Sequence, residues 1–209
     1  MLVVFFIVVR RLPRLLGFRA RLLGVEKIRT LRTGDIVLSS GRTFDGGTLQ
    51  LWMDEIFTHI GIVYVSPDSG NVYIWNSDCA QDDAICVNCG HEHAGPQVQL
   101  LSDKLAASST PDFYIVRTNI SLPAAFNRSW MLRREGRRFR YELLALAHAA
   151  VPALVPQFYT SPDAAFCTEL VAQTLNELLG WNLRTQTTPW QLVVSLPKTL
   201  YLYDVSQAS

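Results

Sequence analysis

The sequence has almost no net charge and few charged residues. Lysine and arginine together number 19, aspartate and glutamate number 18, and the formal net charge is +1. A chain that shows no basic face in the sequence of its body is not expected to bind nucleic acid. Internal repeats and low-complexity tracts are also missing. The 209 residues, 49% of them hydrophobic, are therefore expected to form one domain with a substantial core.

The small net charge hides an asymmetry between a basic leader and an acidic body. Residues 1–32 carry eight basic residues and one acidic residue, and the rest of the chain carries eleven and seventeen. The leader opens with "MLVVFFIVV", nine residues where a membrane-spanning helix needs about twenty. We interpret residues 1–30 as a leader that either contacts an anionic membrane surface or packs on the body, residues 31–209.

Cysteine is scarce, and no convincing secretory signal precedes the body, because the charges of the leader follow its apolar run. Reduced thiols and an intracellular location, with the leader as a membrane contact, are therefore expected rather than secretion. Cys79, Cys86 and Cys89 form a cluster, whereas Cys167 stands alone at the start of "CTELVAQTLNELLGW". A thiol at a helix start is either a small buried hydrophobe or a nucleophile.

Short β-branched and aromatic runs alternate with turn residues through the middle of the chain. Five of them predict strands: "GDIVL", "HIGIVYV", "VYIWNS", "QVQL" and "DFYIVR". Helices are predicted for residues 122–135 and from Cys167 to a C-cap at Gly180, and a turn is expected after "QVQL". Strands followed by helices predict an α+β fold, with a mainly antiparallel sheet packed against helices.

A nucleophilic Cys167 would need a base, and the chain has four histidines. His148 lies in an apolar stretch that is typical of a core histidine, and His91 and His93 lie in a cysteine-rich loop. His59 begins a predicted strand, where a sheet presents polar groups to a cleft. His59 is therefore the candidate base.

The turn "PDSGN" predicts a hairpin in which His59 has two polar neighbours. If Val65 faces Val72, then His59 faces Asp78, and Asn76 lies diagonally on the same face. Either side chain could accept the imidazole Nδ1–H and orient the ring. Alternatively, both residues simply begin a turn.

Taken in order, several motifs resemble a known family. They cover roughly residues 31–196 and are "GDIVL", "THIGIVY", "YIWNS", "GRRFRY", "FCTELVAQTLNELLGW" and "TPWQL". This series resembles the circularly permuted NlpC-like thiol hydrolases of the papain superfamily, in their YiiX-like branch. The resemblance implies a permuted papain-like fold with Cys167 as nucleophile and His59 as base. The third position falls on Asn76, where the family often has glutamate, and Asp78 could take the charged role.

These residues predict a hydrolase or acyltransferase that works through a Cys167 thioacyl intermediate and needs no cofactor for catalysis. The helix N-terminus and His59 are expected to lower the pKa of Cys167 toward neutral. Amide bonds in peptides or isopeptides and acyl groups of lipids are the two substrate classes that the resemblance implies. A catalytically inactive binding protein that keeps the fold is the alternative.

The second cysteine cluster lies in a predicted loop insertion, residues 78–95. It joins Cys86-x-x-Cys89 with His91 and His93, which are ligand types that zinc takes in structural sites. The spacing matches no standard zinc finger. A structural zinc in the 79–93 loop, a zinc-dependent interaction module and a plain thiol-containing loop therefore all stay open.

Overall fold

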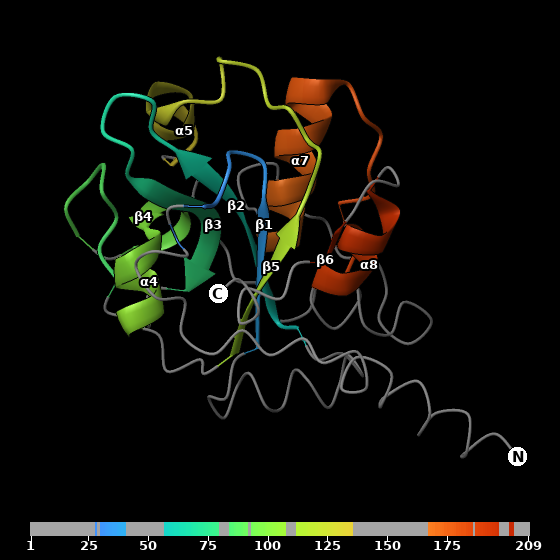
Figure 1. The fold of residues 1–209 in the computed structure, drawn as a ribbon, viewed down its shortest axis with the longest axis horizontal. Coiled ribbons are helices and arrows are strands. Elements are labelled where there is room, and N and C mark those ends of the chain that lie inside the picture. The colour runs from blue at the N-terminus through green and yellow to red at the C-terminus, as the bar shows by residue number, and fades with distance from the viewer. Residues whose placement is uncertain are drawn as a thin grey trace, which may run out of the picture.

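One antiparallel sheet organises the part of the chain that the structure, a computed structural model, describes. That part comprises residues 28, 30–40, 57–79, 84–91, 93–107, 112–135, 167–185, 187–196 and 201–202. The sheet has six strands in the order β4-β3-β2-β1-β5-β6 (Figure 1). The strands are β1 (Ile36–Ser40), β2 (His59–Val65), β3 (Val72–Cys79), β4 (Ala94–Leu100), β5 (Asp112–Arg117) and β6 (Tyr201–Leu202).

Four helices of the described residues complete the α+β architecture that the strand and helix patterns predict. They are α4 (Leu101–Ala107), α5 (Arg128–Glu135), α7 (Cys167–Leu179) and α8 (Pro189–Ser195). In Figure 1, α7 runs alongside the central strands, and it contacts β2 and β3. No helix in this part of the chain is long and apolar enough to cross a bilayer. His148, the "GRRFRY" motif and all of the leader except Ile28 and Thr30 lie outside the described residues.

The predicted hairpin register is confirmed. Val65 pairs with Val72 across the β2–β3 ladder, and the same register places Gly61 opposite Asn76. The turn between the strands is closed by the Gly70 N–H, which donates to the Ser66 carbonyl at 2.9 Å. The hairpin therefore fixes which side chains of β3 lie beside the start of β2.

Each face of the sheet has its own hydrophobic core. One core draws on α5, α7 and α8, and the other on α4 and the residues before β1. Side chains alternate along a strand, so Ile62 enters the first core and Val63 the second. On β2, the His59 side chain points to the same face as Val63, four residues on. On β3, the Asn76 side chain points to the same face as Ile74, which also lies in the second core. Both polar side chains therefore belong to the face that α4 covers.

The helix that begins at Cys167 is confirmed. It ends at Leu179, and Gly180 follows with a φ of +67°, the left-handed conformation that glycine adopts at little cost. The Gly180 N–H donates to the Asn176 carbonyl at 3.0 Å. Cys167 is consequently the first residue of a 13-residue helix.

For the helix that the sequence predicts at residues 122–135, the predicted start at residue 122 is wrong. The helix begins at Arg128, because Asn127 caps it: the Asn127 side-chain oxygen accepts the Trp130 N–H at 3.0 Å. The first N–H groups of a helix have no acceptor within the helix. An asparagine side chain at this position accepts one of them and so fixes where the helix starts.

The turn predicted after β4 is also wrong, because the chain passes directly into helix α4. Leu101 and Leu105 lie one helical turn apart, and both are buried in the second core. Lys104 lies between them and is also buried. A seven-residue helix therefore carries a lysine into the interior next to β3.

We expect Gly61→Ala to destabilise the sheet by about 1–3 kcal/mol, because the added methyl group overpacks the second core. A Cβ at this position would lie 2.7 Å from the Ile74 side chain and 3.1 Å from the Trp75 carbonyl oxygen. Urea denaturation measures the change. The control is Asp68→Ala in the exposed hairpin turn, and equal stability of the two variants would contradict the packing argument.

Candidate functional site

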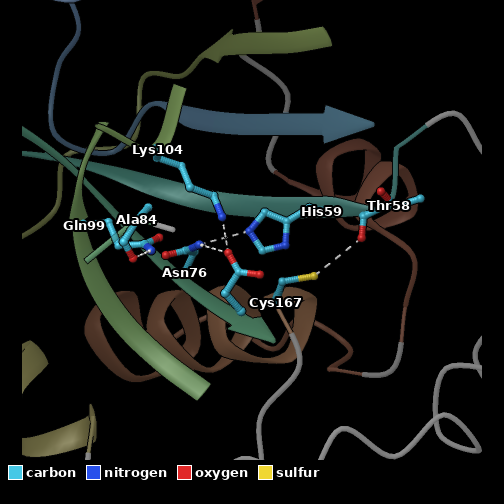
Figure 2. Close-up of polar contacts among 8 residues, drawn as sticks. Thr58, His59, Asn76, Ala84, Gln99, Lys104 and Cys167 are labelled. Atoms are coloured by element: carbon cyan, nitrogen blue, oxygen red, sulfur yellow. Dashed lines mark hydrogen bonds and ion pairs between the residues drawn. The ribbon is translucent and has the colours of Figure 1, made fainter. Parts of the chain in front are cut away.

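The Cys167 thiol lies at the start of β2, where the first turn of α7 meets the strand. Its Sγ lies 4.0 Å from the carbonyl oxygen of Thr58, the residue before the candidate base. Cys167 is partly exposed, and Figure 2 shows its side chain beside the His59 ring. The two residues that the sequence singled out, 108 positions apart, are thus brought together.

Asn76 holds the other side of the His59 ring. Its Nδ2 lies 3.1 Å from His59 Nε2 and donates to Asp78 Oδ2 at 3.3 Å. The ring nitrogen in this contact is Nε2, not the Nδ1 that the sequence analysis expected. Figure 2 shows the ring between the Asn76 amide and Cys167. Asn76 is therefore the residue in position to orient His59, with Asp78 as its own partner.

A buried lysine continues this polar row, and the sequence analysis missed it. Lys104 Nζ forms an ion pair with Asp78 Oδ2, and the two side chains are 2% and 9% exposed. Two charges at this depth are stable only when they are paired. The spacing of the apolar residues could have indicated a buried lysine. If "LLSDKLAA" is a helix, Lys104 falls on its apolar side, between Leu101 and Leu105.

Three buried acceptors on this face have no hydrogen-bond partner among the described residues. They are Asn76 Oδ1, Gln97 Oε1 and Gln99 Oε1, on residues that are 0%, 1% and 1% exposed. Asn76 and Gln97 are direct partners in the β3–β4 ladder, so their side chains project from the same face as close neighbours. An unpaired buried acceptor costs free energy, and a neighbouring pair of them requires an explanation.

The pKa of the Cys167 thiol is raised, contrary to the expectation from the helix N-terminus. Although the residue as a whole is partly exposed, burial of its thiol raises the pKa to about 11, and the Asp78 charge acts in the same direction. Backbone N–H groups of Ile60 and Thr168 oppose the rise without overcoming it. The desolvation of the sulfur outweighs the helix dipole here, so the thiol is protonated at neutral pH.

The second cluster is brought together in part. One ligand atom each of Cys86, Cys89 and His93 lies within 4.8 Å of the others, a group that could hold a metal ion. His91 is not in this group, and its Nδ1 lies 3.0 Å from the Cys89 carbonyl oxygen instead. Three of the four predicted ligands therefore converge.

Comparison with known proteins yields distant matches among solved structures alone. No protein-family model and no curated protein matches the chain. Among solved structures, the crystal structure of the metalloprotein yiiX (DUF1105) from Escherichia coli O157:H7 is similar, with 16% sequence identity and a TM-score of 0.41. The match covers 73% of this chain and 68% of that one. It comes from the branch that the motifs resemble, but similarity at this level does not establish the family.

We expect alkylation of Cys167 by iodoacetamide to be slow at pH 7 and to rise about tenfold per pH unit up to pH 10. A thiol with a pKa of about 11 is only about one ten-thousandth thiolate at pH 7, and the thiolate is the reacting form. Peptide-resolved mass spectrometry measures the rate, and the exposed Cys89 reports reagent activity in the same sample.

The matched variant in that experiment is His59→Ala. Because burial of the sulfur causes the raised pKa, the slope should persist in the variant. Fast labelling that levels off near neutral pH in the wild type, and that is lost in His59→Ala, would contradict a protonated resting thiol and indicate a thiolate–imidazolium pair.

We expect Lys104→Met to lower the free energy of unfolding by about 3–5 kcal/mol, because it leaves the buried Asp78 carboxylate without its countercharge. The double variant Lys104→Met/Asp78→Asn should recover part of this loss, since it removes the uncompensated charge. Urea denaturation of the full double-mutant cycle measures the coupling. The control Asp103→Asn, on the exposed side of α4, should stay within about 0.5 kcal/mol, and additive losses would contradict the pairing.

Proposed function

We propose that this protein is a cysteine hydrolase or acyltransferase with Cys167 as nucleophile and His59 as base. The observation that carries the proposal is a thiol at the start of a helix, next to a histidine whose far side contacts a buried asparagine at 3.1 Å. A nucleophile, a base and an oriented third group form the arrangement that covalent acyl transfer needs. No cofactor is required for this chemistry.

The reaction begins from a neutral thiol and a neutral imidazole. His59 takes the Cys167 proton as the sulfur attacks the substrate carbonyl, so the carbon–sulfur bond forms while the carbonyl oxygen gains negative charge. The first N–H groups of α7 have no partner within the helix and donate to that oxygen. The His59 proton passes to the leaving amine or alcohol as its bond breaks. Water or another acceptor then releases the acyl group and restores the thiol.

This sequence needs a lone pair on the His59 nitrogen that faces away from Asn76. When Asn76 Nδ2 faces His59, it donates to Nε2, and the imidazole proton sits on Nδ1. Half a turn of the amide exchanges its two ends. Oδ1 then accepts the Nε2–H and Nδ1 is free to act as base, while Nδ2 gives up its hydrogen bond to Asp78 Oδ2 and can donate to Gln97, the ladder partner of Asn76. The rotation thus exchanges the hydrogen bond to Asp78 for partners at the unpaired Asn76 Oδ1 and Gln97 Oε1, and Gln97 becomes a positioning residue for the base.

The fold and the substrate class belong to the same proposal. The ordered motifs favour a permuted papain-like fold. In such a fold an antiparallel sheet comes early in the chain and the helix that begins with the cysteine comes late. Peptide or isopeptide amides and lipid acyl groups both fit the chemistry. The basic leader favours a substrate at an anionic membrane surface, because a basic, apolar segment binds such surfaces.

A second candidate is a binding protein that keeps the fold without turnover. The raised pKa of the Cys167 thiol favours it, because a thiol that stays protonated is a weak nucleophile without an effective base. The two candidates differ in one observable property, the formation of an acyl group on the Cys167 sulfur.

We expect the protein to form a covalent acyl adduct on Cys167 when it is incubated with 4-nitrophenyl acyl esters or peptidyl coumarin amides. Intact-protein and peptide mass spectrometry detect the adduct, and nitrophenol or coumarin release measures turnover. Cys167→Ala should abolish both, and His59→Ala should lower kcat by about 10²–10⁴-fold. Gln97→Leu should lower kcat about tenfold through the loss of one hydrogen bond to the orienting amide.

Ser102→Ala, on the exposed side of α4, is the control and should keep wild-type turnover. An absence of adduct and turnover with every acyl and amide probe, in protein that unfolds cooperatively, would contradict the hydrolase and support the binding protein. Turnover that survives Cys167→Ala would place the chemistry elsewhere.

A further inference from the structure

The loop that precedes β4 folds back along that strand and covers the edge of the sheet. The Val87 N–H donates to the Val98 carbonyl at 2.7 Å, and Cys86 forms an isolated β-bridge with Gln99. Gln99 Nε2 donates to the Ala84 carbonyl at 2.7 Å. These contacts hold Cys86 in a defined place against a strand of the sheet.

Helix α5 clamps the same loop from the other side. Arg128 donates to Asn88 Oδ1 at 2.8 Å, and Glu135 Oε1 accepts from Asn88 Nδ2 at 2.7 Å. Glu135 also accepts the Val98 N–H at 3.1 Å. An asparagine held at both ends of its amide fixes the two residues between the cysteines, and so sets the separation of the two thiols.

The turn through Cys86 and Cys89 has the form of a ligand-holding loop. The Gly90 N–H donates to the Cys86 carbonyl at 2.9 Å, and Gly90 has a φ of +75°, which other residues rarely adopt. Burial raises the pKa of the Cys86 thiol to about 11, against the backbone N–H groups of Cys89 and Asn88 that lie at the sulfur, so an ion has to displace the thiol proton. Metals bind cysteine as the thiolate.

His93 supplies a nitrogen that is already set for coordination. Its Nε2 lies 3.2 Å from the Pro96 carbonyl oxygen, which can only accept, so Nε2 carries the proton. Its Nδ1 then has the lone pair, and it lies 3.4 Å from Cys89 Sγ. A ring nitrogen that donates to a backbone carbonyl while the other faces the ion is the usual outer contact of a metal-bound histidine.

We propose that Cys86 Sγ, Cys89 Sγ and His93 Nδ1 bind one Zn²⁺ ion, with a water molecule in the fourth position. Two thiolates and one imidazole suit zinc, which binds both ligand types in tetrahedral sites. Cys89 is exposed and His93 partly so, which leaves the fourth position open to solvent. Binding releases the thiol protons and ties the loop to the start of β4. The site is structural and does not depend on the proposed hydrolase activity.

The test is a zinc measurement on the full chain, purified under reducing conditions and titrated with Zn²⁺ against a colorimetric chelator. We expect about one zinc per chain and a thiolate-to-metal absorption band when Co²⁺ replaces zinc. Cys89→Ser and His93→Ala should each weaken zinc binding by on the order of 100-fold or more. Cys89 is chosen because it is exposed, so its replacement leaves the core intact, and a cooperative unfolding transition verifies this.

His91→Ala is the matched control, because His91 lies in the same loop outside the converging group. It should keep wild-type zinc affinity. Failure of the reduced wild-type protein to bind zinc would overturn the proposal, as would a Cys86–Cys89 disulfide in that protein. An equal loss of zinc affinity in His91→Ala and His93→Ala would also overturn the proposal, because it would show that His93 is not the specific histidine ligand.

Discussion

The pairing of β2 with β3 is the constraint on which the candidate site depends. The register places Gly61 opposite Asn76, and a slip of one residue would move Asn76 to the other face of the sheet, away from His59. Both faces of the sheet are buried against helices, so a slip would also move every apolar side chain of the strand into the wrong core. Glycine at position 61 leaves room for Ile74 to pack over β2. Hydrophobic packing thus fixes the geometry of a polar site.

The polar row on that face carries charge that the protein has to neutralise internally. Asp78 is nearly buried, and Lys104 reaches it from α4. The ion pair keeps a carboxylate beside the Asn76 amide without leaving an uncompensated charge near the thiol. Even so, burial dominates at the sulfur and raises the pKa of Cys167 to about 11. In the proposed reaction, this environment would favour proton transfer to His59 during the attack over a preformed ion pair, because a separated thiolate and imidazolium would both be poorly solvated.

The sequence was sufficient for features that local patterns encode. The turn residues between β2 and β3 predicted the hairpin and its register, and the apolar periodicity after Cys167 predicted a helix that ends at Gly180. The start of α5 was missed because Asn127 caps the helix, and the predicted pattern ran through it. Lys104 was missed because its role depends on where α4 packs, which is a tertiary property. The direction of the Cys167 pKa was wrong for the same reason: desolvation is set by everything packed around the sulfur, and the sequence shows only the helix start.

The two clusters are mechanically linked through the β3–β4 ladder. Asn76 pairs with Gln97, and the next pair in the ladder joins Ser77 to Pro96, whose carbonyl accepts from His93. An ion held by His93 and the two cysteines would therefore fix the start of β4, one residue away from Gln97, the partner of Asn76. Edge strands are the least constrained part of a sheet, and β4 is the edge strand that pairs with β3, the strand of Asn76. Zinc at this position would restrict motion of β4 and thereby hold Gln97 beside the amide that orients His59.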